Sequence, residues 1–178
     1  RCDRVLFHVN DENVWQNYLQ TKVKDVVFEK NANDISVIIP SKDNPDILDK
    51  CLESIERTTG DMPLEIIVVD NGSCKEHRVR VEAMCKFTTE GTKGRMACHY
   101  IYEPMKFHFS KMCNMGAEVA KGEFLLFLND DVELCEPGCV MEMAALANQP
   151  YTGAVGMKLY YPDSCRIQHA GITNLPMG

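Results

Sequence analysis

Three short apolar runs, each followed at once by a turn of acidic, amide or hydroxyl side chains, place the strongest limit on how this chain folds. The runs cover residues 36–39, 64–69 and 123–128. The turns that follow them are Pro40-Ser41-Lys42-Asp43, Asp70-Asn71-Gly72-Ser73 and Asn129-Asp130-Asp131. Short continuous apolar runs indicate strands that are buried on both faces, as the strands of parallel sheets are.

Helical patterns separate these runs. Asn44 and Pro45 suit the N-cap and the first position of a helix that ends at Gly60. The apolar residues of that helix share one face, namely Ile47, Leu48, Cys51, Leu52 and Ile55. Strand, helix and strand therefore form a βαβ unit.

The rest of the chain continues the alternation. The expected elements are a helix in the charged segment after Ser73, a polar loop over 88–95, a strand over 98–102, a helix capped by Ser110 that runs through Lys121 with Gly122 at C′, a helix near Pro137 and a strand over 153–159. Alternation of this kind predicts an α/β fold with a mainly parallel sheet flanked by helices.

The 178 residues leave room for one domain with a core, alone or with a short appendage. We expect residues 1–33 to be an appendage or linker, since Asn31 to Asp34 form a polar break, and residues 34–178 to be the domain. The chain begins with Arg1 rather than Met, so we expect an excerpt of a longer polypeptide.

Composition excludes several classes of protein. The net charge is -7 and the basic residues are dispersed, so we expect no binding to nucleic acid. No apolar run approaches the roughly 20 residues of a transmembrane segment. The nine cysteines are an odd number in a chain too long to need disulfides, which favours the cytoplasm, including its membrane face. Cys135 and Cys139 lack a second ligand pair, which favours free thiols over zinc.

The three polar turns are expected to meet, because ligands of open α/β sheets bind at the carboxyl ends of the strands. One crevice would then hold Asp43, Asp70, Asp130 and Asp131. Their mutual repulsion requires a cation, and oxygen ligands suit Mg²⁺ or Mn²⁺ bridging to a diphosphate. Each turn taken singly has an ordinary explanation, because Asp and Asn also form turns and cap helices.

Four segments in order resemble the nucleotide-sugar-binding half of family 2 glycosyltransferases with the GT-A fold. They are ISVIIPSKD at 35–43, LEIIVVDNGS at 64–73, NMGAEVAKGEFLLFLNDD at 114–131 and GMKLYYPDSCRIQHAGI at 156–172. The resemblance implies transfer of a sugar from a nucleotide diphosphate, most often UDP, to a glycan acceptor, as in polysaccharide biosynthesis.

The resemblance also implies roles for particular residues. The expected nucleotide-binding residues are Pro40, Ser41, Asp43, Asp70, Asn114, Gly116, Asn129 and Asp130, and Asp131 is the expected ligand of Mn²⁺ or Mg²⁺. Asn129 stands where the family's D-x-D motif has its first Asp, so that position offers only a neutral side chain.

An inverting enzyme also needs a carboxylate base for the acceptor hydroxyl. The resemblance places that base beyond Gly178, in an acceptor half that this chain lacks, so we expect donor binding with little turnover. Two alternatives remain open. A nucleotidyltransferase would carry a glycine-rich basic loop after the first strand, which Ser41 to Asn44 do not form, and a non-catalytic scaffolding module would use the carboxylates only as caps.

Overall fold

The computed structural model describes residues 35–150, 152–162, 164 and 166–170. The chain divides into two compact units, one of residues 29–139 and a second that includes residues 140–178. The expected appendage at 1–33 lies outside the described residues.

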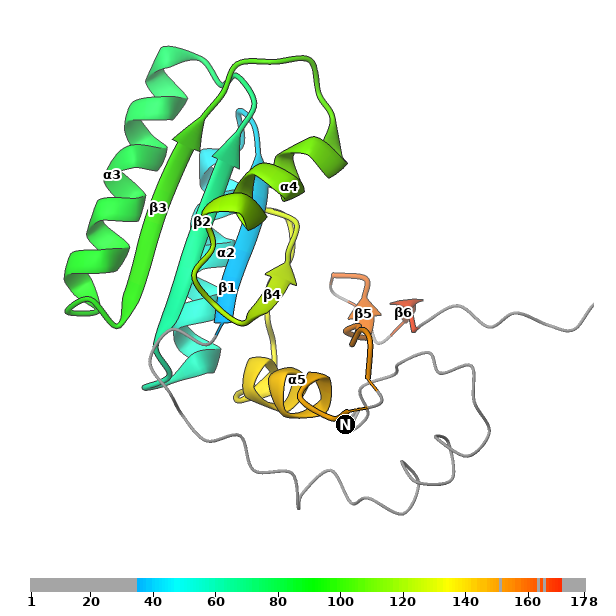
Figure 1. Ribbon diagram of the computed structural model, residues 1–178. Coiled ribbons are helices and arrows are strands. Elements are labelled where there is room, and N and C mark those ends of the chain that lie inside the picture. The colour runs from blue at the N-terminus through cyan, green and yellow to red at the C-terminus, as the bar shows by residue number, and fades with distance from the viewer. Residues whose placement is uncertain (1–34, 151, 163, 165, 171–178) are drawn as a thin grey trace, which may run out of the picture. The chain divides into compact units, whose positions relative to one another are not determined.

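The first unit is built on a parallel sheet of four strands (Figure 1). Its strands are β1 (Ile35–Ser41), β2 (Leu64–Asp70), β3 (Met96–Tyr102) and β4 (Phe124–Phe127), in the order β3-β2-β1-β4. Every residue of β1 and β2 is buried, because central strands of a parallel sheet are covered on both faces. This confirms the α/β prediction.

Three helices cover the two faces of this sheet. They are α2 (Pro45–Thr59), α3 (Lys75–Gly91) and α4 (Phe109–Val119). The helices α2 and α3 contact each other, and α4 packs on β1 and β2. Figure 1 shows α4 in front of the sheet and α2 behind it. Right-handed crossovers require this, since the strand order reverses direction between β3 and β4.

The helix α2 begins where the sequence predicts. Pro45 occupies the first turn, and Leu48, Cys51 and Ile55 are fully buried on the predicted face, whereas Ile47, predicted on the same face, is 43% exposed. Asn44 is the N-cap residue, but its side chain makes no capping hydrogen bond. Its carbonyl accepts the first helical bond, from the N–H of Leu48 at 3.0 Å.

Two predicted boundaries are wrong. The helix α3 continues to Gly91 instead of giving way to a loop at residue 88, because Thr92 closes it with its N–H and hydroxyl on the carbonyl of Thr88. The helix α4 is capped by His108 rather than Ser110, since the His108 ring accepts the N–H of Lys111 at 3.2 Å.

Gly122 is also not a C′ residue, because α4 has Ala120 as its C-cap. An added Cβ at Gly122 would lie 2.6 Å from the backbone nitrogen of Ser36. Glycine is therefore required there for the close approach of the chain to β1.

The second unit carries the last elements, α5 (Cys139–Ala147), β5 (Leu159–Tyr160) and β6 (Ile167–His169). The helix begins two residues after Pro137. The strand predicted at 153–159 is almost entirely wrong, since only its last residue enters β5, which pairs antiparallel with the unpredicted β6. Among the described helices, none has the length and apolar character that crossing a membrane requires.

Candidate active site

The carboxyl edge of the sheet brings three polar side chains from neighbouring strands together. The register places Ser41 opposite Asp70 and Ile38 opposite Phe127. Beyond β4, the N–H of Leu128 still donates to the carbonyl of Ile38 at 3.0 Å. The hydroxyl of Ser41 donates to Oδ2 of Asp130 at 2.7 Å. Ser41 therefore stands between Asp70 on β2 and Asp130 after β4.

The turn after β2 is closed by its own aspartate. Asp70 is 1% exposed, and its Oδ1 accepts the N–H groups of Gly72 and Ser73, each at 2.8 Å. Its Oδ2 accepts the hydroxyl of Tyr100 at 2.5 Å. Burial, with the adjacent Asp70 charge, raises the pKa of Tyr100 above its ordinary value, so the hydroxyl stays a donor. The carboxylate thus holds the turn and joins it to β3.

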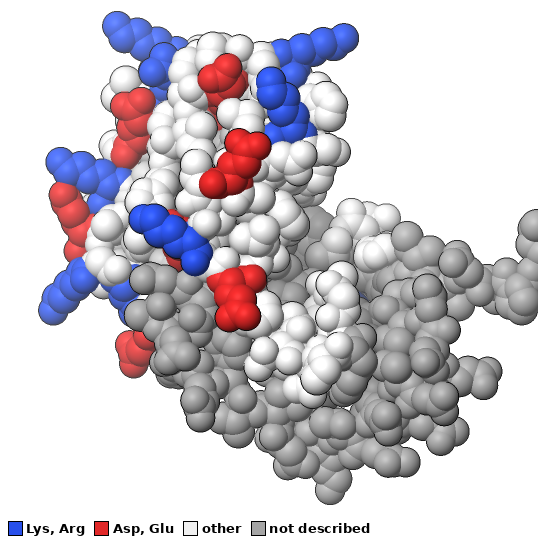
Figure 2. Space-filling model, viewed as in Figure 1, with Lys and Arg blue, Asp and Glu red and all other residues white. Residues whose placement is uncertain are grey.

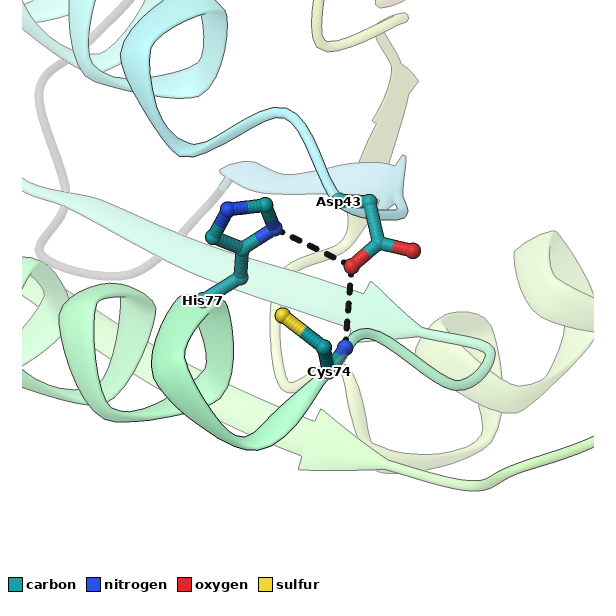
Figure 3. Close-up of side chains that lie close together, drawn as sticks. All are labelled: Asp43, Cys74 and His77. Atoms are coloured by element: carbon teal, nitrogen blue, oxygen red, sulfur yellow. Dashed lines mark hydrogen bonds and ion pairs between the residues drawn. The ribbon is translucent and has the colours of Figure 1, made fainter.

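The turn after β1 is tied to the turn after β2 by Asp43. Its N–H donates to the hydroxyl of Ser73 at 2.7 Å, and its Oδ1 accepts the N–H of Cys74 at 2.9 Å. The same oxygen lies 3.0 Å from Nδ1 of His77 (Figure 3). The Cys74 N–H chiefly, and also His77, hold the pKa of Asp43 below its ordinary value against an opposing effect of burial. Asp43 is therefore a carboxylate at neutral pH.

The turn after β4 differs, because its negative charge is not neutralised. Burial chiefly, and the charge of Asp131, raise the pKa of Asp130, while the Ser41 hydroxyl opposes the rise. Burial and the same acidic residues raise the pKa of Cys51, in α2, to about 12. None of the ion pairs in the described part of the chain involves Asp130, Asp131 or Glu133. Two adjacent carboxylates without a cation are suited to binding one.

The remaining predicted residues lie around this edge. Pro40 is buried within β1, opposite Val69. Asn129 and Asp131 are exposed, and the Asn129 carbonyl lies 3.8 Å from the thiol of Cys51. Asn114 is exposed on α4. Gly116 is buried on α4, where an added Cβ would lie 2.5 Å from Cγ2 of Ile38. Packing of α4 on β1 thus requires glycine at position 116.

Cys74 and His77, which the fold brings to Asp43, are not among the residues predicted from the sequence. Their C-x-x-H spacing at the start of a helix was a usable signal. Asp43 lies thirty-one residues before Cys74, so its part in the group follows only from the pairing of β1 with β2.

Charges of both signs lie interspersed over the face of the described residues seen in Figure 2. In α3, for example, Arg78 lies 3.8 Å from Glu82 and Lys86 lies 3.8 Å from Glu90. The visible face thus carries no extended basic patch that would compete with the carboxyl edge for an anionic ligand.

Comparison with known proteins identifies the family. Residues 36–174 match the family described as Glycosyl transferase family 2. The chain is 40% identical over 139 residues to the uncharacterized protein y4gI of Sinorhizobium fredii, and 32% identical over 138 residues to the O-antigen biosynthesis protein RfbC of Myxococcus xanthus. Each match covers 78% of this chain but only 14% and 10% of those proteins.

Solved structures confirm the GT-A type of fold. The mannosyltransferase PcManGT of Pyrobaculum calidifontis superimposes with a TM-score of 0.58 at 19% identity, over 76% of this chain and 38% of that one. TarS of S. aureus gives a TM-score of 0.51 at 24% identity, over 65% of this chain and 32% of that one. Since the family match extends over most of its residues, this chain belongs to glycosyltransferase family 2.

Proposed function

We propose that this chain is the donor-binding half of an inverting, metal-dependent glycosyltransferase that moves a sugar from a nucleotide diphosphate to a glycan hydroxyl. Membership of the family supports sugar transfer. One observation carries the finer proposal: Asp130 and Asp131 lie at the carboxyl edge with no cation paired to them among the described residues.

The donor would bind along the carboxyl edge of the sheet, where Ser41 lies between Asp70 and Asp130. Pro40, Ser41, Asp43 and Asp70 would contact the nucleoside. Asp70 is buried, but the two turn N–H groups and the Tyr100 hydroxyl do not use all the lone pairs of its carboxylate, so it can accept a further hydrogen bond from the nucleoside. Asn129 and Asp130 would lie near the ribose and the diphosphate.

The helix α4 would supply the sugar side of the site. It packs on β1 and β2, and its exposed Asn114 is free of the packing that Gly116 serves. Asn114 would donate and accept hydrogen bonds to donor hydroxyls, while Gly116 would keep the helix close enough for that contact.

Asp131, with Asp130 beside it, would hold Mn²⁺ or Mg²⁺. The two carboxylates fit such an ion, since they are oxygen ligands and leave positions for water and diphosphate oxygens. The bound ion would supply charge stabilisation of the departing diphosphate. The residues of this chain bind and orient the donor, and the carboxylate base for the acceptor is not assigned to any of them.

The choice of nucleotide is supported only by similarity. We favour UDP because of the resemblance to family 2 enzymes, but GDP belongs in any test, because PcManGT was solved with GDP-Man and Mn2+. The relation to an O-antigen biosynthesis protein supports a glycan acceptor.

A stability titration tests the proposal. Unfolding by urea is measured with UDP, GDP or dTDP, with and without Mn²⁺. A nucleotide at 100 times its Kd adds about 2.7 kcal/mol to the free energy of unfolding. We expect this gain with Mn²⁺ present, and its loss in Asp131→Ala.

Glu136→Ala is the matched control, since Glu136 is a nearby exposed carboxylate, and it should keep the gain. The absence of any nucleotide effect in the unmodified chain would favour a scaffolding module. An equal gain in Asp131→Ala would remove Asp131 from the site.

A further inference from the structure

Three side chains of different chemistry converge beside the carboxyl edge. Asp43, Cys74 and His77 each offer one ligand atom, and these atoms all lie within 4.8 Å of one another. Figure 3 shows the His77 ring and the backbone N–H of Cys74 joined to the same oxygen of Asp43, with the Cys74 sulfur on the side of His77. Among the described residues, this is the one group of three His, Cys, Asp or Glu side chains found this close together.

The fold holds the three residues in place independently of any ligand. Cys74 is the N-cap residue of α3, and His77 lies in the first turn of that helix. Asp43 comes from the turn between β1 and α2, which its own N–H fixes to the hydroxyl of Ser73. The pairing of β1 with β2 therefore sets the distance between the two segments.

Helix capping alone explains only part of this arrangement. Asp43 caps the N–H of Cys74, and the 3.0 Å contact with Oδ1 of Asp43 accounts for the position of His77. Neither function uses the thiol of Cys74. Cap residues are ordinarily Ser, Thr, Asp or Asn, so a cysteine at the N-cap beside a histidine and a carboxylate is better explained as a ligand.

We propose that Asp43, Cys74 and His77 bind Zn²⁺. Thiolate, imidazole and carboxylate together suit this borderline-soft ion, whereas Mg²⁺ and Mn²⁺ prefer oxygen ligands. A tetrahedral zinc ion would separate a nitrogen and an oxygen ligand by about 3.3 Å. His77 Nδ1 and Asp43 Oδ1 are 3.0 Å apart, so a small movement would admit the ion.

The zinc site would have an open fourth position. Asp43 and Cys74 are exposed and His77 is half-buried, so water can complete the tetrahedron, as it does where the protein supplies three ligands. The site shares Asp43 with the proposed nucleoside contacts, but Cys74 and His77 belong to it alone, and it prefers another metal than Asp130 and Asp131 do. The inference does not depend on the proposed donor site.

Cobalt substitution tests the site in the full chain. Co²⁺ replaces Zn²⁺ in tetrahedral sites, and a thiolate ligand then gives a charge-transfer band in the near ultraviolet. We expect the metal-free protein to develop this band with one equivalent of Co²⁺, and Zn²⁺ to abolish it. Cys74→Ser should lose the band and keep its fold, because serine is a favoured N-cap residue.

Two further variants complete the test. His77→Gln should weaken Co²⁺ binding by roughly tenfold or more. Cys135→Ser is the matched control, since Cys135 is also an exposed free thiol, and it should keep both band and affinity. A band that persists in Cys74→Ser, or no band in the unmodified protein, would overturn the proposal. Circular dichroism of each variant checks that the fold is intact.

Discussion

The turns after β2 and β4 carry aspartates at the same edge of one sheet but use them in opposite ways. Asp70 is buried and accepts hydrogen bonds from two backbone N–H groups and one hydroxyl. Asp130 accepts the hydroxyl of Ser41 and has Asp131 as its charged neighbour. The Asp70 carboxylate closes the turn after β2, whereas the turn after β4 keeps an excess of negative charge.

This difference distinguishes an aspartate that stabilises the fold, Asp70, from aspartates that are suited to binding a cation, Asp130 and Asp131. A buried carboxylate whose hydrogen-bond donors lie inside the protein stabilises the folded state, whereas adjacent carboxylates without a cation repel each other and destabilise it. A position at the carboxyl edge is therefore insufficient to assign a role to an aspartate. The role depends on the hydrogen-bond partners of its carboxylate.

The comparison predicts its largest effect on folding at Asp70. Asp70→Ala leaves three donors without their acceptor and should lower the free energy of unfolding by about 3 kcal/mol or more. Asp131→Ala, at an exposed position, should change it by less than about 0.5 kcal/mol. Urea unfolding without metal or nucleotide measures both. Equal effects of the two substitutions would show that the two turns do not differ as described.

Substitution of Gly116 tests whether this residue, which lies in a segment that resembles the family, serves the packing of α4 on β1. Gly116→Ala should cost about 2 kcal/mol, since its Cβ would meet Ile38 at 2.5 Å in a filled core. Gly153→Ala is the control, because nothing lies within 4 Å of a Cβ there. Thermal unfolding of the two variants gives the difference. A neutral Gly116→Ala would leave nucleotide or sugar contact as its main role.

A smaller effect should appear at Asp130. Its raised pKa means that the folded state holds a proton that the unfolded state has lost, so stability falls as pH rises from the ordinary value of 3.8 through the raised pKa. Asp130→Asn removes this loss and keeps an acceptor for Ser41. Above that window the variant should be more stable by about 0.5 kcal/mol, after allowance for solvent screening.

Unfolding curves of Asp130→Asn measured from pH 3 to pH 7 would check the sign. The gain should vanish at the acidic end, where Asp130 is protonated in both states. A variant that is less stable than the parent at pH 7 would mean that the Asp130 charge is already neutralised within the protein.

Much of the first unit's fold could be predicted, because continuous apolar runs indicate buried strands and apolar residues at helical spacing indicate the buried face of a helix. The run LEIIVVD and the face of Leu48, Cys51 and Ile55 both appear where expected. The errors fall where a tertiary contact decides. His108 replaces Ser110 as the cap of α4, and Gly122 is present because β1 lies against it rather than because a helix ends.

The candidate site was likewise predictable only in part. Strand ends placed Ser41, Asp70 and Asp130 together, since parallel strands share an edge. The partners of each carboxylate were not readable from the sequence. Tyr100 reaches Asp70 from β3, and His77 reaches Asp43 from α3, and both contacts depend on side-chain directions that spacing alone does not give.

Electron paramagnetic resonance of Mn²⁺ measures whether Asp131 holds the metal, because the free ion's signal falls when the ion is bound. With a saturating nucleotide diphosphate, we expect the chain to remove up to one Mn²⁺ per chain from the free signal beyond what the nucleotide removes by itself, and Asp131→Ala to prevent this. A free Mn²⁺ signal that the chain leaves unchanged with UDP, GDP and dTDP in turn would mean that Asp131 holds no metal beside the nucleotide.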